Sequence, residues 1–245
     1  MTALGFLHPG HSAEDDYPRI EQLLGSDIRL DVVHTETGED VHRVEALRAM
    51  GTPQLLAPAV EELRLSGAEA VVWACTAGSF ALGWEGARDQ VRALARAAGT
   101  PASSTSFGFA HALREVGVRR VAVGATYPDD VAGLFADFLR AGGAEVVAVR
   151  GAGTDVVTAA EVSAWGEAEL FALARSADDP SAEALLLPDT DLHTAAHLPA
   201  LEEELGKPVL TAAQVTVWEA LRLADRRVNA PALGSLFARE PLVQV

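Results

Sequence analysis

The 245-residue sequence predicts an α/β fold in two halves, each built around its own parallel sheet and related by a pseudo-twofold axis. Two observations predict this class. Short apolar runs alternate with longer amphipathic stretches, which is typical of βαβ units. The same pattern, an apolar run that leads directly into a short polar turn, also occurs twice, at 70–75 and at 184–188.

The expected elements follow one another along the chain. Apolar runs indicate strands at 4–8, 28–34, 70–75, 120–124, 145–149, 184–188 and 209–211. Helical periodicity indicates helices at 14–24, 53–65, 84–98, 106–116, 129–141, 159–176, 192–205 and 213–223. Glycines that stop helices follow several of these stretches, at positions 25, 67, 117 and 142.

The repetition extends beyond the two strands. Gly-x-Pro followed by a helix that contains Ala-Leu-Arg occurs at 99–114 and again at 206–222. The alternative is that all βαβ units look alike. A duplication assigns residues 1–115 and 213–245 to the first half and residues 116–212 to the second. It places Cys75 and Asp189 at equivalent strand ends, and ligands of open α/β sheets bind beyond such ends. We therefore expect the active site between the halves.

Composition narrows the classes of function. The formal net charge is −16, and so acidic a surface repels phosphate backbones, which disfavours a nucleic-acid partner. The apolar runs are too short to cross a bilayer, and the N-terminal segment lacks the features of a secretory signal. The single cysteine excludes an intramolecular disulfide. These features favour a cytoplasmic protein with no membrane partner.

The segment Cys75-Thr76-Ala77-Gly78-Ser79 is the most informative candidate site. A cysteine directly after a buried strand, followed by small residues that open a turn or helix, lies near free backbone N–H groups. Such donors favour the thiolate over the thiol, and they can hold a carboxylate or a developing oxyanion. The alternative is a buried structural cysteine, which is the commoner fate of a lone cysteine.

Asp189-Thr190-Asp191 closes the corresponding strand of the second half. Asp189 can act as a general acid or base if burial raises its pKa. The alternative is a cap on the helix expected from residue 192, a role that suits Asp191 better. Tyr127 follows the strand at 120–124, where its phenol either donates to a substrate oxygen or packs against the turn.

Four histidines lie near these features. His8 and His11 flank Pro9-Gly10 at the end of the first expected strand and either line the cleft or belong to an ordinary polar loop. His193 and His197 are spaced i, i+4 on an expected helix, as metal ligands can be, although both imidazoles can equally face solvent. The sequence has no phosphate-binding loop, no complete dinucleotide fingerprint and no nucleophile elbow, which disfavours nicotinamide, flavin and nucleotide chemistry.

Three segments resemble motifs of the aspartate/glutamate racemase superfamily, and most closely its branch of maleate cis-trans isomerases and arylmalonate decarboxylases. They are Cys-Thr-Ala-Gly-Ser-Phe at 75–80, Tyr-Pro-Asp-Asp-Val at 127–131 and Glu-Glu-Glu-Leu-Gly-Lys-Pro-Val at 202–209. The resemblance covers nearly the whole chain. It implies two Rossmann-like halves with the active site between them, no metal or organic cofactor, a small carboxylate or dicarboxylate substrate, and a homodimer or homotetramer.

The resemblance also implies roles for single residues. Cys75 matches the first of two cysteines that racemases and maleate isomerases use, and Asp189 holds the position of the second. The decarboxylase branch keeps its single cysteine in that second position, and the isomerase branch usually carries an asparagine in the first turn, where this chain has Pro-Gly-His-Ser. The implied substrate-binding residues are Thr76, Ala77, Tyr127, Thr190, Pro9 and Ser12.

Three functions follow as hypotheses. In an isomerase of the maleate type, the Cys75 thiolate adds to a double bond, rotation follows, and the thiolate leaves. In a decarboxylase or racemase-like enzyme, Cys75 protonates one face of an enolate and Asp189 serves the other. In the third, the protein binds a carboxylate but has lost catalysis, because Asp189 replaces the second cysteine.

Overall fold

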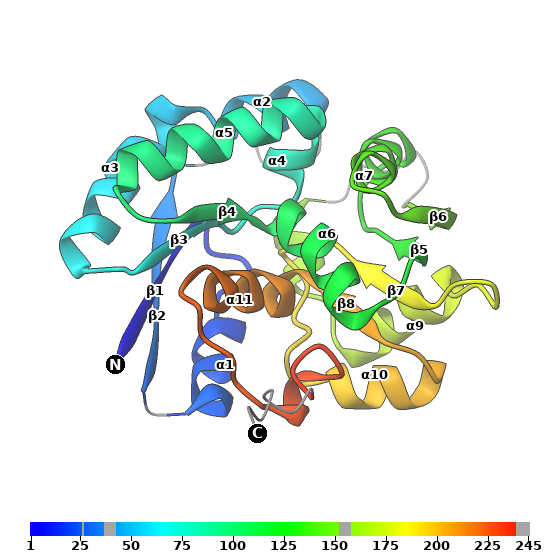
Figure 1. Cartoon of the computed structure of the whole chain (residues 1–245). Helices are drawn as coiled ribbons and strands as arrows, with labels where there is room; N and C mark the ends of the chain where they lie inside the picture. The colour runs from blue at the N-terminus through cyan, green and yellow to red at the C-terminus, as the bar shows by residue number, and fades with distance from the viewer. Residues whose placement is uncertain (26, 37–42, 152–157, 239–245) are drawn as a thin grey trace.

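Two parallel sheets of four strands form the frame of the protein (Figure 1). The computed structural model describes residues 1–25, 27–36, 43–151 and 158–238. The strand order is β2-β1-β3-β4 in the first sheet and β6-β5-β7-β8 in the second. The order is the same in both sheets when β5 to β8 are matched with β1 to β4. The predicted α/β fold of two parallel-sheet halves is confirmed.

The elements have the following bounds. The strands are β1 (Thr2–Pro9), β2 (Ile28–Thr35), β3 (Ala70–Trp73), β4 (Ala102–Ser104), β5 (Arg120–Gly124), β6 (Glu145–Arg150), β7 (Ala184–Leu187) and β8 (Val209–Thr211). The α-helices are α1 (Asp16–Leu24), α2 (Val44–Met50), α3 (Pro53–Ser66), α4 (Ala77–Phe80), α5 (Gly83–Ala98), α6 (Thr105–Val116), α7 (Asp129–Ala141), α8 (Ala159–Ser163), α9 (Glu167–Ala177), α10 (Leu198–Leu205) and α11 (Ala212–Leu223).

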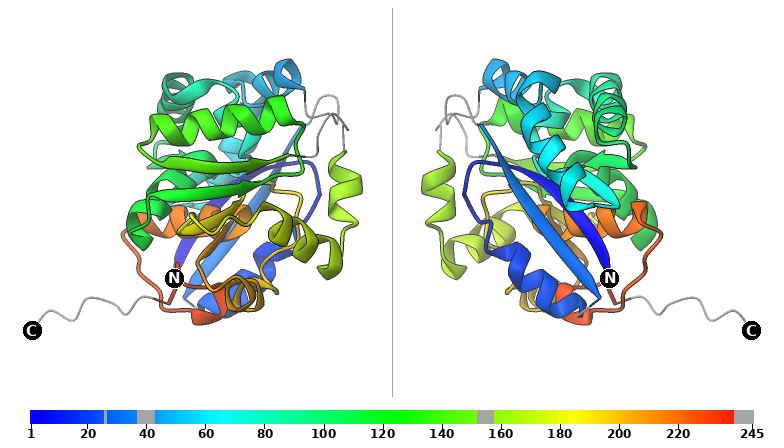
Figure 2. Two further views of the ribbon diagram at one scale, coloured as in Figure 1. Left: turned by 90° about the vertical axis from the view of Figure 1, so that its right-hand side faces the viewer. Right: turned by 90° about the vertical axis from the view of Figure 1, so that its left-hand side faces the viewer.

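Helices cover the first sheet on both faces. α3 and α5 pack together on one side of it, while α1 and α11 contact it from the other side (Figures 1 and 2). α11 lies late in the chain, yet it packs against β3, β4 and α6 of the first half. The division into 1–115 plus 213–245 and 116–212 stays a prediction, and its last residues, 239–245, lie outside the described residues. Among the described helices, none is both long and apolar enough to cross a membrane.

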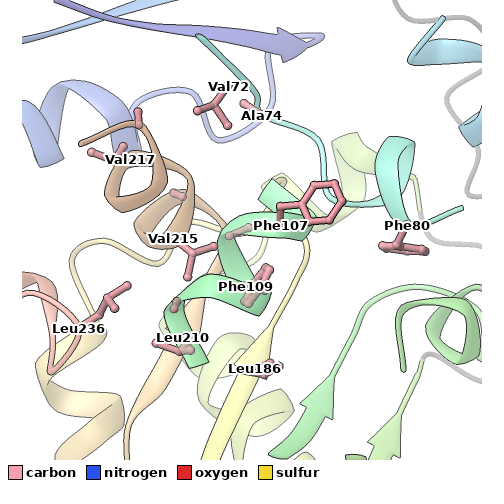
Figure 3. Close-up of a cluster of buried hydrophobic side chains, with 14 of the residues drawn as sticks. Val72, Ala74, Phe80, Phe107, Phe109, Leu186, Leu210, Val215, Val217 and Leu236 are labelled. Carbon is pink, nitrogen blue, oxygen red and sulfur yellow. The ribbon is translucent and has the colours of Figure 1, made fainter. Parts of the chain in front are cut away.

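One apolar core joins the two halves. Val72 and Ala74 of the first half and Leu186 and Leu210 of the second belong to the same buried cluster, and phenylalanines of α4 and α6 lie among them (Figure 3). Burying one valine, leucine or phenylalanine side chain contributes about 1.5–3 kcal/mol to the free energy of unfolding. The shared core therefore fixes the ends of β3 and β7 relative to each other.

The structure corrects two predicted helices. The helix expected at 192–205 begins only at Leu198, because side-chain carboxylates bind the backbone N–H groups of the preceding turn. The helix expected at 159–176 is split into α8 and α9, and at the break the Gly166 N–H donates to the Glu169 carboxylate at 3.0 Å. The short elements β4, α2 and α4 were not predicted, since few residues carry their pattern.

Asp16 links the first helix to the second half. Its buried carboxylate accepts hydrogen bonds from the backbone N–H groups of Thr194 and Ala195, at 2.8 and 3.0 Å. Burial raises the pKa of Asp16, and these two hydrogen bonds lower it. The loop that follows β7 is thereby held against α1.

We expect Asp16→Ala to lower the free energy of unfolding by about 2 kcal/mol, because it leaves buried N–H donors without an acceptor. Urea unfolding followed by circular dichroism measures this loss. Asp15→Ala is the matched control: the Asp15 side chain is 77% exposed and pairs only across the surface with His193. The control should change stability by less than about 1 kcal/mol. Equal losses in both variants would contradict the assignment.

Candidate active site

Cys75 lies two residues after β3, in the turn that leads into α4. Its sulfur accepts a hydrogen bond from the Gly78 N–H at 3.2 Å. A Cβ atom added at position 78 would lie 3.1 Å from this sulfur, so glycine permits the close approach. The turn thus presents backbone donors to the thiol, as the sequence predicted.

Two buried polar side chains hold this turn in place. The Ser106 hydroxyl donates to the Thr76 carbonyl at 2.8 Å. The Gln90 amide donates to the Gly78 and Gly51 carbonyls at 2.9 and 3.0 Å. These bonds join α5, α6 and the end of α2 to the turn, so the thiol position is set by the packing of three helices.

The Cys75 thiol is closed off from solvent. The residue is 4% exposed, and the Met50 sulfur at the end of α2 lies 3.6 Å from its own sulfur. Burial raises the pKa of Cys75 to about 12, and the charges of Asp191 and Asp189 act in the same direction, while the Gly78 N–H lowers it. The backbone donors act as expected, but burial outweighs them, so the resting thiol is protonated at neutral pH.

Asp189 occupies the equivalent place in the second half, two residues after β7. It is 1% exposed, and its carboxyl accepts hydrogen bonds from the Asp191 N–H, at 2.9 Å, and from the Thr126 hydroxyl. Burial raises the pKa of Asp189 to about 6, and hydrogen bonds from the backbone and side chain of Asp191 lower it. The side chains of Asp189 and Asp191 form a carboxyl pair. Because two ionised carboxylates only accept hydrogen bonds, a hydrogen bond between these two groups needs one proton that they share.

Tyr127 connects the thiol with this carboxyl pair. Its buried hydroxyl donates to the Pro188 carbonyl at 3.1 Å. Burial raises the pKa of Tyr127, the nearby charges of Asp189, Cys75 and Asp191 raise it further, and a hydrogen bond with the Thr76 side chain lowers it. We call Cys75, Thr76, Tyr127, Asp189 and Asp191 the thiol–carboxyl cluster. Because apolar cores rarely gather such groups, the cluster favours a site over a purely structural cysteine.

The other predicted site residues lie around this cluster. Ala77 is buried, and its backbone N–H faces the Cys75 sulfur, whose pKa it lowers. Pro9 and Ser12 are half-buried at the end of β1, and Thr190 is half-buried beside Asp189. In the described parts of the chain, no hydrogen bond joins Ser12 or Thr190 to Cys75 or Asp189.

The histidines do not form the predicted pairs. His8 is fully buried beside Tyr17, and burial lowers its pKa to about 4. His193 precedes α10 and His197 stands at its N-cap, so the expectation that both lie on one face of a helix is wrong. His193 instead lies 3.1 Å from the Ser163 carbonyl.

Several residues of the site escaped the sequence analysis. The Tyr17 hydroxyl of α1 hydrogen-bonds with the Thr216 side chain and lies close enough to Cys75 for its charge to raise the Tyr17 pKa. Met50 covers the thiol. Tyr17 lies on the buried face of α1, where it looks like a core residue, and Met50 ends α2, a helix that the sequence did not predict. Thr126 had a usable signal, since it directly precedes Tyr127 in a turn after a strand.

Comparisons with known proteins identify a matching family model and a curated relative. The family model of arylmalonate decarboxylase matches residues 52–237. Arylmalonate decarboxylase of Bordetella bronchiseptica is 34% identical over 147 residues, which make up 59% of this chain. That match spans 61% of the length of the curated relative.

Solved structures match over nearly the whole chain. A liganded double mutant of arylmalonate decarboxylase, in which a cysteine replaces a glycine and a serine replaces a cysteine, has a TM-score of 0.83 at 27% identity and covers 97% of this chain and 99% of its own. A maleate-bound mutant of the maleate isomerase from Pseudomonas putida shares the fold, with a TM-score of 0.87 at 20% identity and 97% coverage of both chains. The chain belongs to the arylmalonate decarboxylase family, within the Asp/Glu racemase-like superfamily.

Proposed function

We propose that the protein is an enzyme that decarboxylates a small malonate-type dicarboxylate, with Cys75 as the proton donor. The observation that carries this proposal is the protonated thiol, buried among hydrogen-bond donors and a carboxyl pair. A thiol in this state can deliver a proton to carbon, whereas a nucleophile must first lose its own.

The proposed reaction has two steps. The bond between the central carbon and one carboxylate breaks, carbon dioxide leaves, and the electron pair remains on the other carboxylate as an enolate. Donors at Thr76, Tyr127 and the Ala77 N–H stabilise the enolate oxygens. The Cys75 proton then bonds to the central carbon. The resulting thiolate takes a proton from the carboxyl pair of Asp189 and Asp191, which solvent reprotonates.

The surroundings of the thiol also favour a class of substrate. Cys75 also belongs to an apolar cluster with Leu7 and Trp73, and Met50 packs against it. An apolar substituent on the central carbon of a malonate suits such surroundings. The curated relative is named for arylmalonates, which carry an aromatic ring at this carbon.

A second candidate is the cis-trans isomerisation of a small dicarboxylate, the function that the sequence first favoured. The Gly78 N–H on the Cys75 sulfur supports it, because this donor stabilises a thiolate. Asp189 would then accept or return the proton that the thiol gives up. The homodimer or homotetramer implied by the superfamily stays a prediction, which sedimentation can measure.

The first test incubates the full chain with phenylmalonate, maleate and aspartate and follows each by NMR. We expect carbon dioxide release from phenylmalonate, and Cys75→Ala should lower kcat by at least about 100-fold because the proton donor is lost. Calorimetry of the same variant should show that substrate binding persists. Fumarate formed from maleate would favour the isomerase instead. Binding without turnover of any substrate would indicate a carboxylate-binding protein.

The second test is the pH dependence of kcat. Asp189 has a pKa of about 6, so its protonated form is lost as the pH rises through this value. Because the carboxyl pair returns the proton to Cys75, we expect kcat to fall above about pH 6. Asp189→Asn should lower kcat and flatten this decline, while Asp137→Asn, an exposed control on α7, should leave the profile unchanged. A rate that rises through the same range would contradict the proposed role.

The third test moves the thiol to the other half. Protonation from the Cys75 side alone should convert a malonate with two different substituents into one enantiomer. The variant that combines Cys75→Ala with Asp189→Cys should give the opposite enantiomer, since the two positions close equivalent strands. Chiral chromatography measures the product. A racemic product from the original chain, or an unchanged hand after the exchange, would contradict the single-sided protonation.

A further inference from the structure

Two histidines and a glutamate meet at one edge of the first sheet, apart from the thiol–carboxyl cluster. The His11 Nδ1 lies 3.5 Å from the Glu14 carboxylate, and the His34 Nε2 contacts the same carboxylate oxygen. The rings of His11 and His34 have centroids 3.9 Å apart. One ligand atom from each of the three residues lies within 4.8 Å of the others.

Two separate elements bring these side chains together. His34 is the penultimate residue of β2, an edge strand of the first sheet, which lies towards the viewer in the right-hand view of Figure 2. His11 and Glu14 come from the loop between β1 and α1. In this loop Gly10 and Ala13 have positive φ, at 64° and 50°. A left-handed alanine is disfavoured and often marks a functional segment, and here it helps turn the loop back towards β2.

The chemistry of the trio is that of a metal site. We propose that His11, Glu14 and His34 bind one divalent transition-metal ion of the zinc class. Two imidazoles and a carboxylate are ligands that Zn²⁺ prefers, at about 2.0–2.2 Å. His11 is 73% exposed and Glu14 40%, so both can adjust to these distances and the remaining coordination positions open to water. The net charge of −16 also favours a cation over an anion.

The ion would hold the β1–α1 loop against β2. This loop carries Ser12 and leads into α1, which supplies Tyr17 and Asp16 to the site and to the loop after β7. β2 and β3 flank β1 on opposite sides, and adjacent strands lie about 4.8 Å apart, so β2, which carries His34, and β3, which leads to Cys75, are about 10 Å apart. The ion would stabilise the loop from outside the thiol–carboxyl cluster and take no part in bond breaking.

The experiment titrates the full, metal-free chain with Co²⁺ and Zn²⁺. We expect one ion per chain by calorimetry, cobalt absorption bands without the charge-transfer band of a thiolate ligand, and a Tm rise of about 5 °C at a hundredfold excess over Kd. These readouts do not depend on turnover. His34→Ala and Glu14→Gln should each weaken binding at least tenfold.

His197→Gln provides the matched control, because this histidine stands at the N-cap of α10 with its nearest acid, Glu167, at 3.9 Å. It should bind as tightly as the original chain. Unchanged affinity in His34→Ala, a thiolate charge-transfer band, or the absence of any stoichiometric binding would overturn the proposal. If His34→Ala or Glu14→Gln fails to fold, His11→Ala gives the same test from the exposed end of the loop.

Discussion

Cys75, Asp189 and Asp191 are buried near one another, and the protein must keep them from carrying full charge together. In water all three would titrate independently, whereas here burial raises the pKa of the thiol to about 12 and that of Asp189 to about 6. The Gly78 N–H lowers the pKa of Cys75 and hydrogen bonds from Asp191 lower that of Asp189, so both moderate the effect of burial. The rest of the architecture serves to hold these groups together.

The continuous apolar core makes that arrangement possible. If each half had a separate core, the ends of β3 and β7 could shift against each other, and the thiol would move relative to the carboxyl pair. Residues of both sheets instead pack around the phenylalanines of α4 and α6. Close packing of this kind transmits position from one half to the other.

The sequence predicted the fold well where a pattern was long or repeated. The bounds of β5 and α7 are those expected, because a short apolar strand and an amphipathic helix meet there at a clear turn. The helix expected at 192–205 failed for a tertiary reason. Asp189 and Asp16 take the N–H groups of Asp191, Thr194 and Ala195, and Asp16 lies far away in the sequence. The same limit hid Tyr17 and Met50 from the site, since no local pattern tells a core side chain from one that faces a thiol.

Asp16 and Tyr17 are neighbours on α1, yet one binds the loop beside Asp189 and the other faces Cys75. One turn of α1 therefore contacts both halves of the protein. If the two halves moved apart, the hydrogen bonds from Thr194 and Ala195 to Asp16 would break, and the buried Asp16 carboxylate would lose its donors. Ligand entry that leaves these hydrogen bonds in place requires the Met50 side chain, whose sulfur lies 3.6 Å from that of Cys75, to move away from the thiol.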